Sequence, residues 1–141
     1  LAGLRLGDHV ILTQSLGSSI ADAATTVVSG GPLLVENGRV NVRTAEEQMA
    51  PDIARGRAPR TAVGLKPDGT LLMLVVDGRS SASAGMTLAE LAQYFVKLGA
   101  VSAVNYDGGG SSEMVINGKI VNKPSDGRER LVSIGLGLFI K

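Results

Sequence analysis

Short apolar runs separated by turn residues divide most of the chain. Three dipeptides of the kind that two-residue hairpin turns prefer stand between such runs: Asn37-Gly38, Asp68-Gly69 and Asn117-Gly118. The pattern therefore predicts three β-hairpins. They are expected over residues 29–42, 61–78 and 113–122.

One longer segment, residues 87–98, has the periodicity of an amphipathic helix. Thr87 and Glu90 have the spacing of a capping box, and Gly99 is a suitable residue to end the helix. The positions that share the apolar face are Leu88, Leu91, Ala92 and Phe95.

A strand precedes this helix and another follows it. Residues 71–76 are apolar without interruption, which predicts a central strand covered on both faces. With the helix and a strand at 101–106 they form a β-α-β crossover, so the two strands run parallel. Both strands end in Asp-Gly, which puts Asp77 and Asp107 at one edge of the sheet. Strand spacing separates them by about 5 Å if the strands are adjacent and about 10 Å if one strand intervenes.

The remaining segments give weaker predictions. Short strands are expected at residues 9–13 and 131–140, while residues 18–28 are ambiguous. Residues 43–59 are polar and predict a loop, with one helical turn at residues 45–49. The expected fold is one domain of the α+β or α/β class, built from a mixed β-sheet, β-hairpins and the β-α-β crossover.

Composition narrows the possible functions. The 141 residues are 44% apolar but only 3% aromatic, so one domain with an aliphatic core is expected. The net charge of +1 is dispersed, which argues against a nucleic-acid partner, and no apolar run is long enough to span a membrane. The absence of Cys excludes thiol chemistry, and His9 is the sole histidine available for a catalytic triad.

The segment after residue 106 contains several candidate ligand-binding residues. Gly108, Gly109 and Gly110 let backbone N–H groups approach a ligand, and Ser111 adds a hydroxyl, a combination suited to sugars and phosphates. A tight turn between strands is the alternative explanation for these glycines. Arginines at strand ends suit anionic groups, and they are Arg60, Arg79 and Arg130. No metal-ligand cluster and no cofactor are predicted, although a divalent cation recruited by Asp77, Asp107 and Asp126 is left open.

Three blocks occur in a familiar order: SGGPLLVENGRV, APRTAVGLKPDGTLLMLVVDGR and VNYDGGGSSEMVINGKIVNKPSDGRERLV. With them, about residues 25–141 resemble the phosphodiester glycosidase domain family. The resemblance implies a hydrolase that removes an N-acetylglucosamine-like sugar from a phosphodiester, in a secreted or cell-envelope location. It also implies that twelve residues line or shape the site. They are Gly30, Gly31, Arg60, Thr61, Asp77, Arg79, Asp107, Gly108, Gly109, Gly110, Ser111 and Arg130.

The resemblance suggests roles for the charged residues. Asp107 would act as base or nucleophile toward the anomeric carbon, and Asp77 would be a second carboxylate or would orient an arginine. Arg60 and Arg130 would stabilise the leaving phosphate. The separation of the two carboxylates would distinguish a retaining from an inverting enzyme.

Two departures from the family pattern keep an alternative open. Ala58 stands where family members often carry His, and an upstream family block is not recognisable. The single domain at 1–141 is therefore expected to lack its N-terminal part. The alternative function is a non-catalytic module that binds a sugar phosphate or an envelope polysaccharide. The sequence does not predict an oligomeric state.

Overall fold

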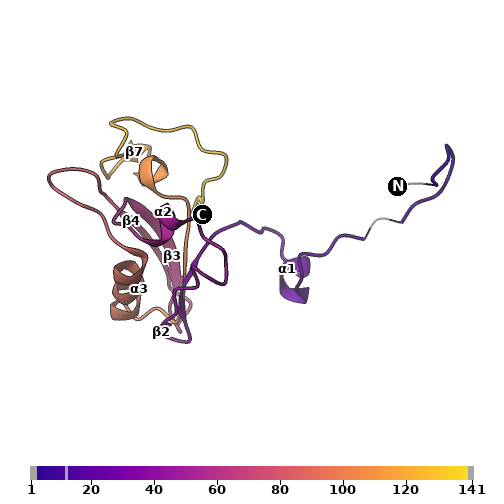
Figure 1. Ribbon diagram of the computed structural model, residues 1–141, viewed down its shortest axis with the longest axis horizontal. Helices are drawn as coiled ribbons and strands as arrows, with labels where there is room; N and C mark the ends of the chain where they lie inside the picture. Colours follow the sequence, from indigo (N-terminus) through magenta and orange to yellow (C-terminus); the bar gives the residue numbers. More distant parts are fainter. Residues whose placement is uncertain (1–2, 12, 140–141) are drawn as a thin grey trace.

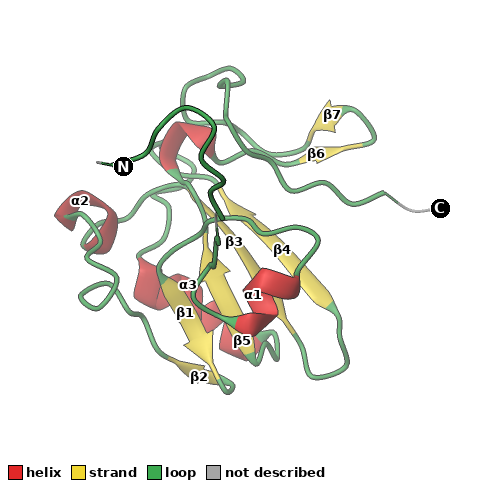
Figure 2. Ribbon diagram, turned by 90° about the vertical axis from the view of Figure 1, so that its right-hand side faces the viewer, coloured by secondary structure: helices red, strands yellow, loops and turns green. Residues whose placement is uncertain are grey.

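The computed structural model describes residues 3–11 and 13–139. Its body is a five-stranded sheet in the order β2-β1-β5-β3-β4, with helix α3 packed on one face (Figures 1 and 2). The strands are β1 (Leu33–Glu36), β2 (Arg39–Val40), β3 (Arg60–Leu65), β4 (Leu71–Val76) and β5 (Ser102–Asn105). A separate two-stranded ribbon contains β6 (Val115–Ile116) and β7 (Lys119–Ile120).

All three predicted hairpins are confirmed. They are β1–β2, β3–β4 and β6–β7, each with antiparallel pairing. In the first and third, both turn residues have positive φ: Asn37 and Gly38 at 51° and 72°, Asn117 and Gly118 at 51° and 74°. Positive φ at both positions is the requirement of a type I′ turn, which Asn-Gly meets with little strain.

Helix α3 (Leu88–Lys97) begins and ends where its sequence predicts. Thr87 and Glu90 form the complete capping box, and Gly99 follows the last turn with φ +86°. The four predicted apolar positions are buried, and Phe95 is fully covered. A Cβ on Gly64 of β3 would lie 2.6 Å from the Phe95 ring, so the glycine lets the helix approach the sheet closely.

The crossover has one strand between its two ends. Both β4 and β5 pair antiparallel with β3, so they run parallel to one another without touching. The sheet therefore belongs to an α+β fold, and all of its paired neighbours are antiparallel, whereas the crossover had suggested a mixed sheet. Of the two separations expected for Asp77 and Asp107, the larger one, about 10 Å, follows from the intervening strand.

The prediction that residues 71–76 form a central strand is wrong. In the described structure β4 pairs only with β3 and is the edge strand, with most of its residues half-buried. An unbroken apolar run shows that both faces of a strand meet apolar surroundings, but it does not show the strand's position in the sheet. Here one surface of β4 faces a cavity that residues 131–137 border from the other side.

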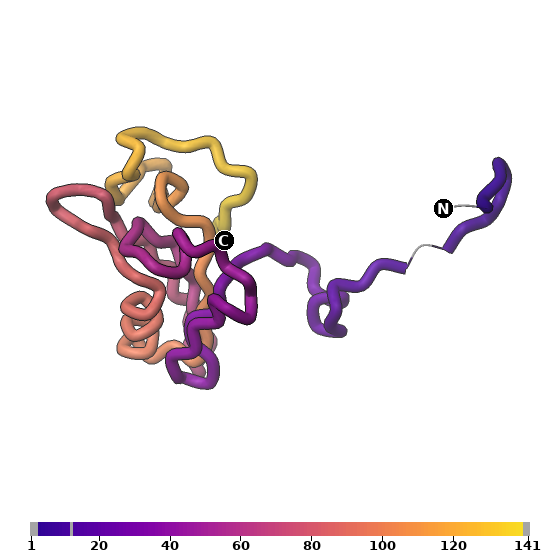
Figure 3. The backbone as a smooth tube through the Cα atoms, viewed as in Figure 1, coloured from indigo at the N-terminus to yellow at the C-terminus, as the bar shows by residue number. Residues whose placement is uncertain are grey.

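Two other strand predictions fail. Residues 131–139 and the described part of 9–13 are irregular, while residues 12 and 140 lie outside the described residues. Helix α1 (Ser19–Ala23) forms within the ambiguous segment and has no buried residue, and helix α2 (Pro51–Ala54) lies just after the predicted helical turn. Figure 3 shows the N-terminal segment leading away from the sheet. Among the described residues, no helix has the length and apolarity that crossing a membrane requires.

Candidate active site

The two Asp-Gly dipeptides meet at Pro59, at the start of β3. A Cβ on Gly78 would lie 2.7 Å from the Pro59 nitrogen, and one on Gly108 would lie 2.8 Å from the Pro59 oxygen. Both dipeptides thus need glycine because the Pro59 backbone passes between them. This packing places Asp77 and Asp107 on either side of the β3 N-terminus, at the one sheet edge that the crossover predicted.

Asp107 stands at the end of β5 with its side chain exposed to the cavity. Its Oδ1 accepts a hydrogen bond of 2.9 Å from the N–H of Gly108. The chain then turns through the 3₁₀ helix η1 (Gly109–Ser111), where the Gly109 N–H donates to the Pro59 oxygen at 3.0 Å. The glycine loop is therefore attached to β3 by its backbone and holds Asp107 at the rim of the sheet.

A cavity of about 740 Å³ opens beside this loop. One part of its wall is polar and is formed by Thr61, Asp107, Ser111, Glu113 and Arg130. The other part is apolar and combines β4 with the irregular C-terminal segment. Its side chains include Val63, Met73, Val75, Met114, Val115, Leu131, Ile134 and Leu136.

The first glycine pair, Gly30 and Gly31, adjoins the same sheet edge. The Gly31 N–H donates to the Asn105 oxygen at 2.7 Å, and the buried Asn105 side chain donates to the Gly31 oxygen at 2.9 Å. A Cβ on Gly30 would lie 3.1 Å from the Tyr106 ring. The pair shapes the approach to β5, and the neighbouring Ser29 reaches the cavity wall.

Two arginines lie against the glycine loop. Arg130 forms an ion pair with Asp126, with a closest contact of 2.5 Å. A Cβ on Gly110 would lie 2.4 Å from atoms of both side chains, so the pair rests directly on this glycine. The Arg79 guanidinium lies over Gly109, where a Cβ would be 3.2 Å from Nη2. Among the described residues, Arg79 forms no ion pair within 4.0 Å.

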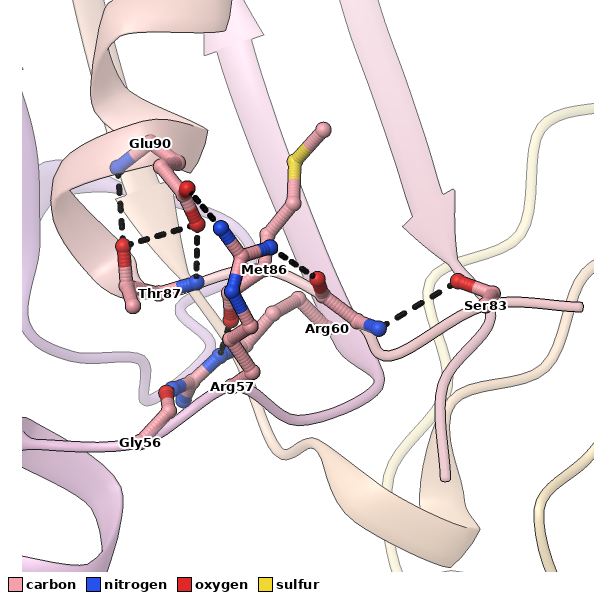
Figure 4. Close-up of polar contacts among 8 residues, drawn as sticks. Gly56, Arg57, Arg60, Ser83, Met86, Thr87 and Glu90 are labelled. Carbon is pink, nitrogen blue, oxygen red and sulfur yellow. Dashed lines mark hydrogen bonds and ion pairs between the residues drawn. The ribbon is translucent and has the colours of Figure 1, made fainter. Parts of the chain in front are cut away.

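The structure does not bring Arg60 into the cavity. Burial alternates along β3, so Arg60, Ala62 and Gly64 are buried while Thr61 and Val63 border the cavity. The Arg60 guanidinium donates to three backbone oxygens, those of Ile53, Gly56 and Met86, at 2.8–3.1 Å. Figure 4 shows the surroundings of Arg60, with Gly56 and Met86 among the residues drawn.

Arg60 is only 3% exposed, and burial lowers the pKa of its guanidinium. It therefore joins α2 and the loop before α3 to the sheet. Its neighbour Thr61 lies on the cavity side, where its hydroxyl donates to the Ser112 hydroxyl at 3.2 Å.

The Asp77 side chain is also engaged in hydrogen bonds within the protein. Its Oδ1 accepts hydrogen bonds from the Asn122 side chain at 3.0 Å and from the Lys123 N–H at 2.9 Å. Asn122 is a residue that the sequence did not single out, because its partners lie 45 and 10 positions away. Within the described residues no group of three His, Asp or Glu side chains is placed to bind a metal ion.

Glu113 is another residue that the sequence did not select, and it lies on the cavity wall. Burial raises the pKa of its carboxyl, and the neighbouring Glu129 raises it further. The site thus contains an acidic group that holds its proton more tightly than an ordinary glutamate does.

Comparisons with known proteins extend these observations. The family model described as phosphodiester glycosidase matches residues 2–139. The chain is 45% identical over 67 residues to the N-acetylglucosamine-1-phosphodiester alpha-N-acetylglucosaminidase of Bos taurus, covering 48% of this chain and 12% of that protein. It is 42% identical over 90 residues to the uncharacterized SPbeta prophage-derived protein YomE of Bacillus subtilis, covering 64% and 14%.

One solved structure is similar in fold as well as in sequence. It is the catalytic domain of the zebrafish N-acetylglucosamine-1-phosphodiester alpha-N-acetylglucosaminidase, auto-inhibited by its pro-peptide. The TM-score is 0.61 and the identity 30%, covering 70% of this chain and 34% of that domain. The chain therefore spans only about a third of this structural relative.

Proposed function

Because the chain belongs to the phosphodiester glycosidase family, we propose that it forms part of an extracytoplasmic hydrolase that cleaves a sugar-1-phosphodiester at the anomeric carbon. The sugar is N-acetylglucosamine or a close analogue, as the name of the bovine relative suggests. The location outside the cytoplasm is proposed from the family likeness. The observation that carries the reaction is the meeting of Asp107, the glycine loop and Arg130 at one cavity.

The chemistry suits this set of groups. Cleavage at the anomeric carbon releases a phosphate monoester, whose second pKa is about 6. Such a leaving group needs little protonation and is stabilised well by cations and backbone N–H groups. Arg130 and Arg79 pack against the glycine loop. In this proposal they stabilise the leaving phosphate, the role that the sequence had suggested for Arg60 and Arg130.

Asp107 acts in this proposal as the base or nucleophile. It is exposed to the cavity, and one of its oxygens already accepts the Gly108 N–H. Since Asp77 is bound to Asn122 and Lys123, it does not serve as the partner carboxylate. A separation of about 10 Å would also exceed what paired carboxylates use.

The test is release of free N-acetylglucosamine from an α-linked sugar-1-phosphodiester. Because the chain spans a small share of its relatives, the longest natural form of the protein is the one to assay. We expect turnover that Asp107→Asn abolishes, and a preference for the phosphodiester over an aryl α-glycoside of the same sugar. Turnover that survives in Asp107→Asn would contradict the assigned role.

A second candidate is a module that binds a sugar phosphate without cleaving it. The engagement of Asp77 favours it, since Asp107 then has no carboxylate partner from β4. This candidate predicts no turnover of either substrate by the wild-type protein. Binding of N-acetylglucosamine-1-phosphate, measured by calorimetry, would then persist in Asp107→Asn and weaken in Arg130→Met.

A further inference from the structure

Residues 113–130 form a unit, here called the flap, that stands apart from the sheet. It contains the β6–β7 ribbon, which Figure 2 shows beside the main sheet and separate from it. The flap brings Glu113, Met114, Val115 and Arg130 to the cavity wall. Its position therefore determines two of the five residues of the polar wall, Glu113 and Arg130, as well as the ion pair on Gly110.

The hydrogen bonds that attach the flap to the sheet share one acceptor atom. Among the described residues, the hydrogen bonds that join it to residues before the glycine loop are two, and both end on Asp77 Oδ1. The donors are the Asn122 side chain at 3.0 Å and the Lys123 N–H at 2.9 Å. The Asp126–Arg130 pair of the flap also packs on Gly110.

Asn122 links this atom to the flap's own backbone. Its Oδ1 accepts the Met114 N–H at 2.9 Å, and its Nδ2 donates to the Ser112 oxygen at 3.0 Å in addition to Asp77. One side chain thus joins the end of β4, the exit of the glycine loop and the first strand of the ribbon. The donors and acceptors of its amide are matched by partners of the opposite kind.

We propose that Asp77 is a positioning residue that, through Asn122, fastens the flap across the cavity. It acts in the reaction only by fixing the cavity wall that Glu113 and Arg130 supply. This inference rests on the proposed function for its kinetic consequence, but not for its structural one. In this proposal Asp77 serves as a hydrogen-bond acceptor. The alternative is that its negative charge acts on the substrate.

The two roles make opposite demands on the side chain. A positioning residue needs only an oxygen that accepts two hydrogen bonds, and Asn supplies one in the same place. A catalytic carboxylate needs its charge, which Asn lacks. The pair Asp77→Asn and Asp77→Ala therefore separates them, because only the second removes the acceptor.

The kinetic experiment compares these two variants with wild type in the longest natural form. Asp77→Asn should stay within about threefold of the wild-type kcat/KM, while Asp77→Ala should lose about 10- to 100-fold, chiefly through KM, since hydrogen bonds to a charged group are lost. The matched control is Asn41→Ala, which removes an Asn–carboxylate bond of 2.8 Å to Glu36, and neither residue lines the cavity. It should leave kcat/KM unchanged.

A second measurement does not depend on activity. Hydrogen exchange at the Lys123 and Met114 amides should be unchanged in Asp77→Asn and faster by about tenfold in Asp77→Ala, where the attachment opens. Asn122→Asp keeps the oxygen that accepts the Met114 N–H but removes the N–H donors to Asp77 and Ser112. It should therefore also speed exchange at Lys123. This variant provides the test if Asp77→Ala folds poorly. Adding Asp77→Asn to it should slow that exchange again.

The outcomes are distinct. If Asp77→Asn is as inactive as Asp77→Ala while its amides stay protected, the charge acts on the substrate and the proposal is overturned. It is overturned equally if the Lys123 amide exchanges at the wild-type rate in both Asp77→Ala and Asn122→Asp. If wild type shows no turnover, the proposed function fails, and the exchange rates still decide how the flap is held.

Discussion

The two faces of the five-stranded sheet differ in how their side chains are held. On the face toward α3, Phe95 covers Gly64 and Arg60 donates to three backbone oxygens. On the opposite face the strands border an open cavity, and a flap held at Asp77 Oδ1 forms part of its wall. Strand β3 contributes to both, because successive residues point to opposite faces.

The difference shows that the same residue type does different work on the two faces. Arg60 is buried and donates to backbone oxygens, whereas Arg79 and Arg130 pack against the glycine loop and Arg130 borders the cavity. Changes on the α3 face should lower stability, and changes on the cavity face should alter binding or turnover with smaller effects on stability. Substitutions at Phe95, Arg60, the loop glycines and Glu113 test this division.

Phe95→Ala should be the most destabilising. The ring is fully buried between α3 and the sheet, and its loss should lower the free energy of unfolding by about 3–5 kcal/mol. Urea denaturation measures it, with Tyr94→Ala as the control on the same helix, since Tyr94 is 38% exposed. Equal losses in the two variants would show that α3 is not packed as described.

Arg60→Met should follow, at about 2–4 kcal/mol, because it leaves three backbone oxygens without their donor. Arg57→Met is the matched control. Arg57 forms a half-exposed ion pair with Glu90 and donates to one backbone oxygen, that of Gly85, at 3.0 Å. Its loss should therefore cost about 1–2 kcal/mol, less than the loss of Arg60. An Arg60→Met protein of wild-type stability that has lost turnover would instead place this arginine at the substrate.

Substitutions at Gly108 and Gly110 of the loop should differ in the same way, one affecting stability and the other binding. A Cβ on Gly108 would press on the backbone oxygen of Pro59, and the backbone must then shift, at about 1–3 kcal/mol. A Cβ on Gly110 meets only the ends of the Arg130 and Asp126 side chains, which can move. Gly110→Ala should therefore keep most of its stability in thermal unfolding and lose affinity for N-acetylglucosamine-1-phosphate. The reverse order would contradict the packing of Pro59 between the two Asp-Gly dipeptides.

The smallest effect should be a pH dependence from Glu113. Its pKa is raised in the folded protein, so over the window from its ordinary value up to the raised one the folded state holds the proton more tightly than the unfolded chain. Stability should therefore fall slightly as pH rises through this window. Comparing thermal unfolding of wild type and Glu113→Gln across it should show a shallower slope in the variant, and Glu129→Gln should reduce the slope as well. If neither substitution changes the slope, the pH dependence of stability comes from other groups.

Local signals were the ones that the sequence predicted well. The Asn-Gly turns, the Thr87 capping box and the apolar face of α3 depend on residues a few positions apart, and all agree with the structure. The prediction that Asp77 and Asp107 lie at one edge of the sheet came from the crossover, because a β-α-β connection makes its two strands parallel. The roles of the twelve site residues remain predictions.

Long-range contacts were the ones that the sequence could not supply. Nothing local to Asn122 indicates that it meets Asp77, 45 positions earlier. The alternation along β3 contained the information that Arg60 and Thr61 point to opposite faces, but not which face the cavity occupies. The apolar segments at 71–76 and 131–139 indicated apolar surroundings. In the structure Met73 and Val75 border the cavity together with residues 131–137, whereas Leu72 and Val76 pack against the core.

The edge position of β4 has a consequence for handling the protein. Six consecutive apolar residues with one unpaired row of backbone groups are a template for adding a strand, and natural proteins usually protect such an edge with charge, proline or a covering segment. Residues 71–76 contain neither a charged residue nor proline, and no strand of the described residues pairs with their outer edge. Solutions of the 141-residue chain should therefore associate as concentration rises, and one charged residue on this edge should improve its solubility more than the same change on β2.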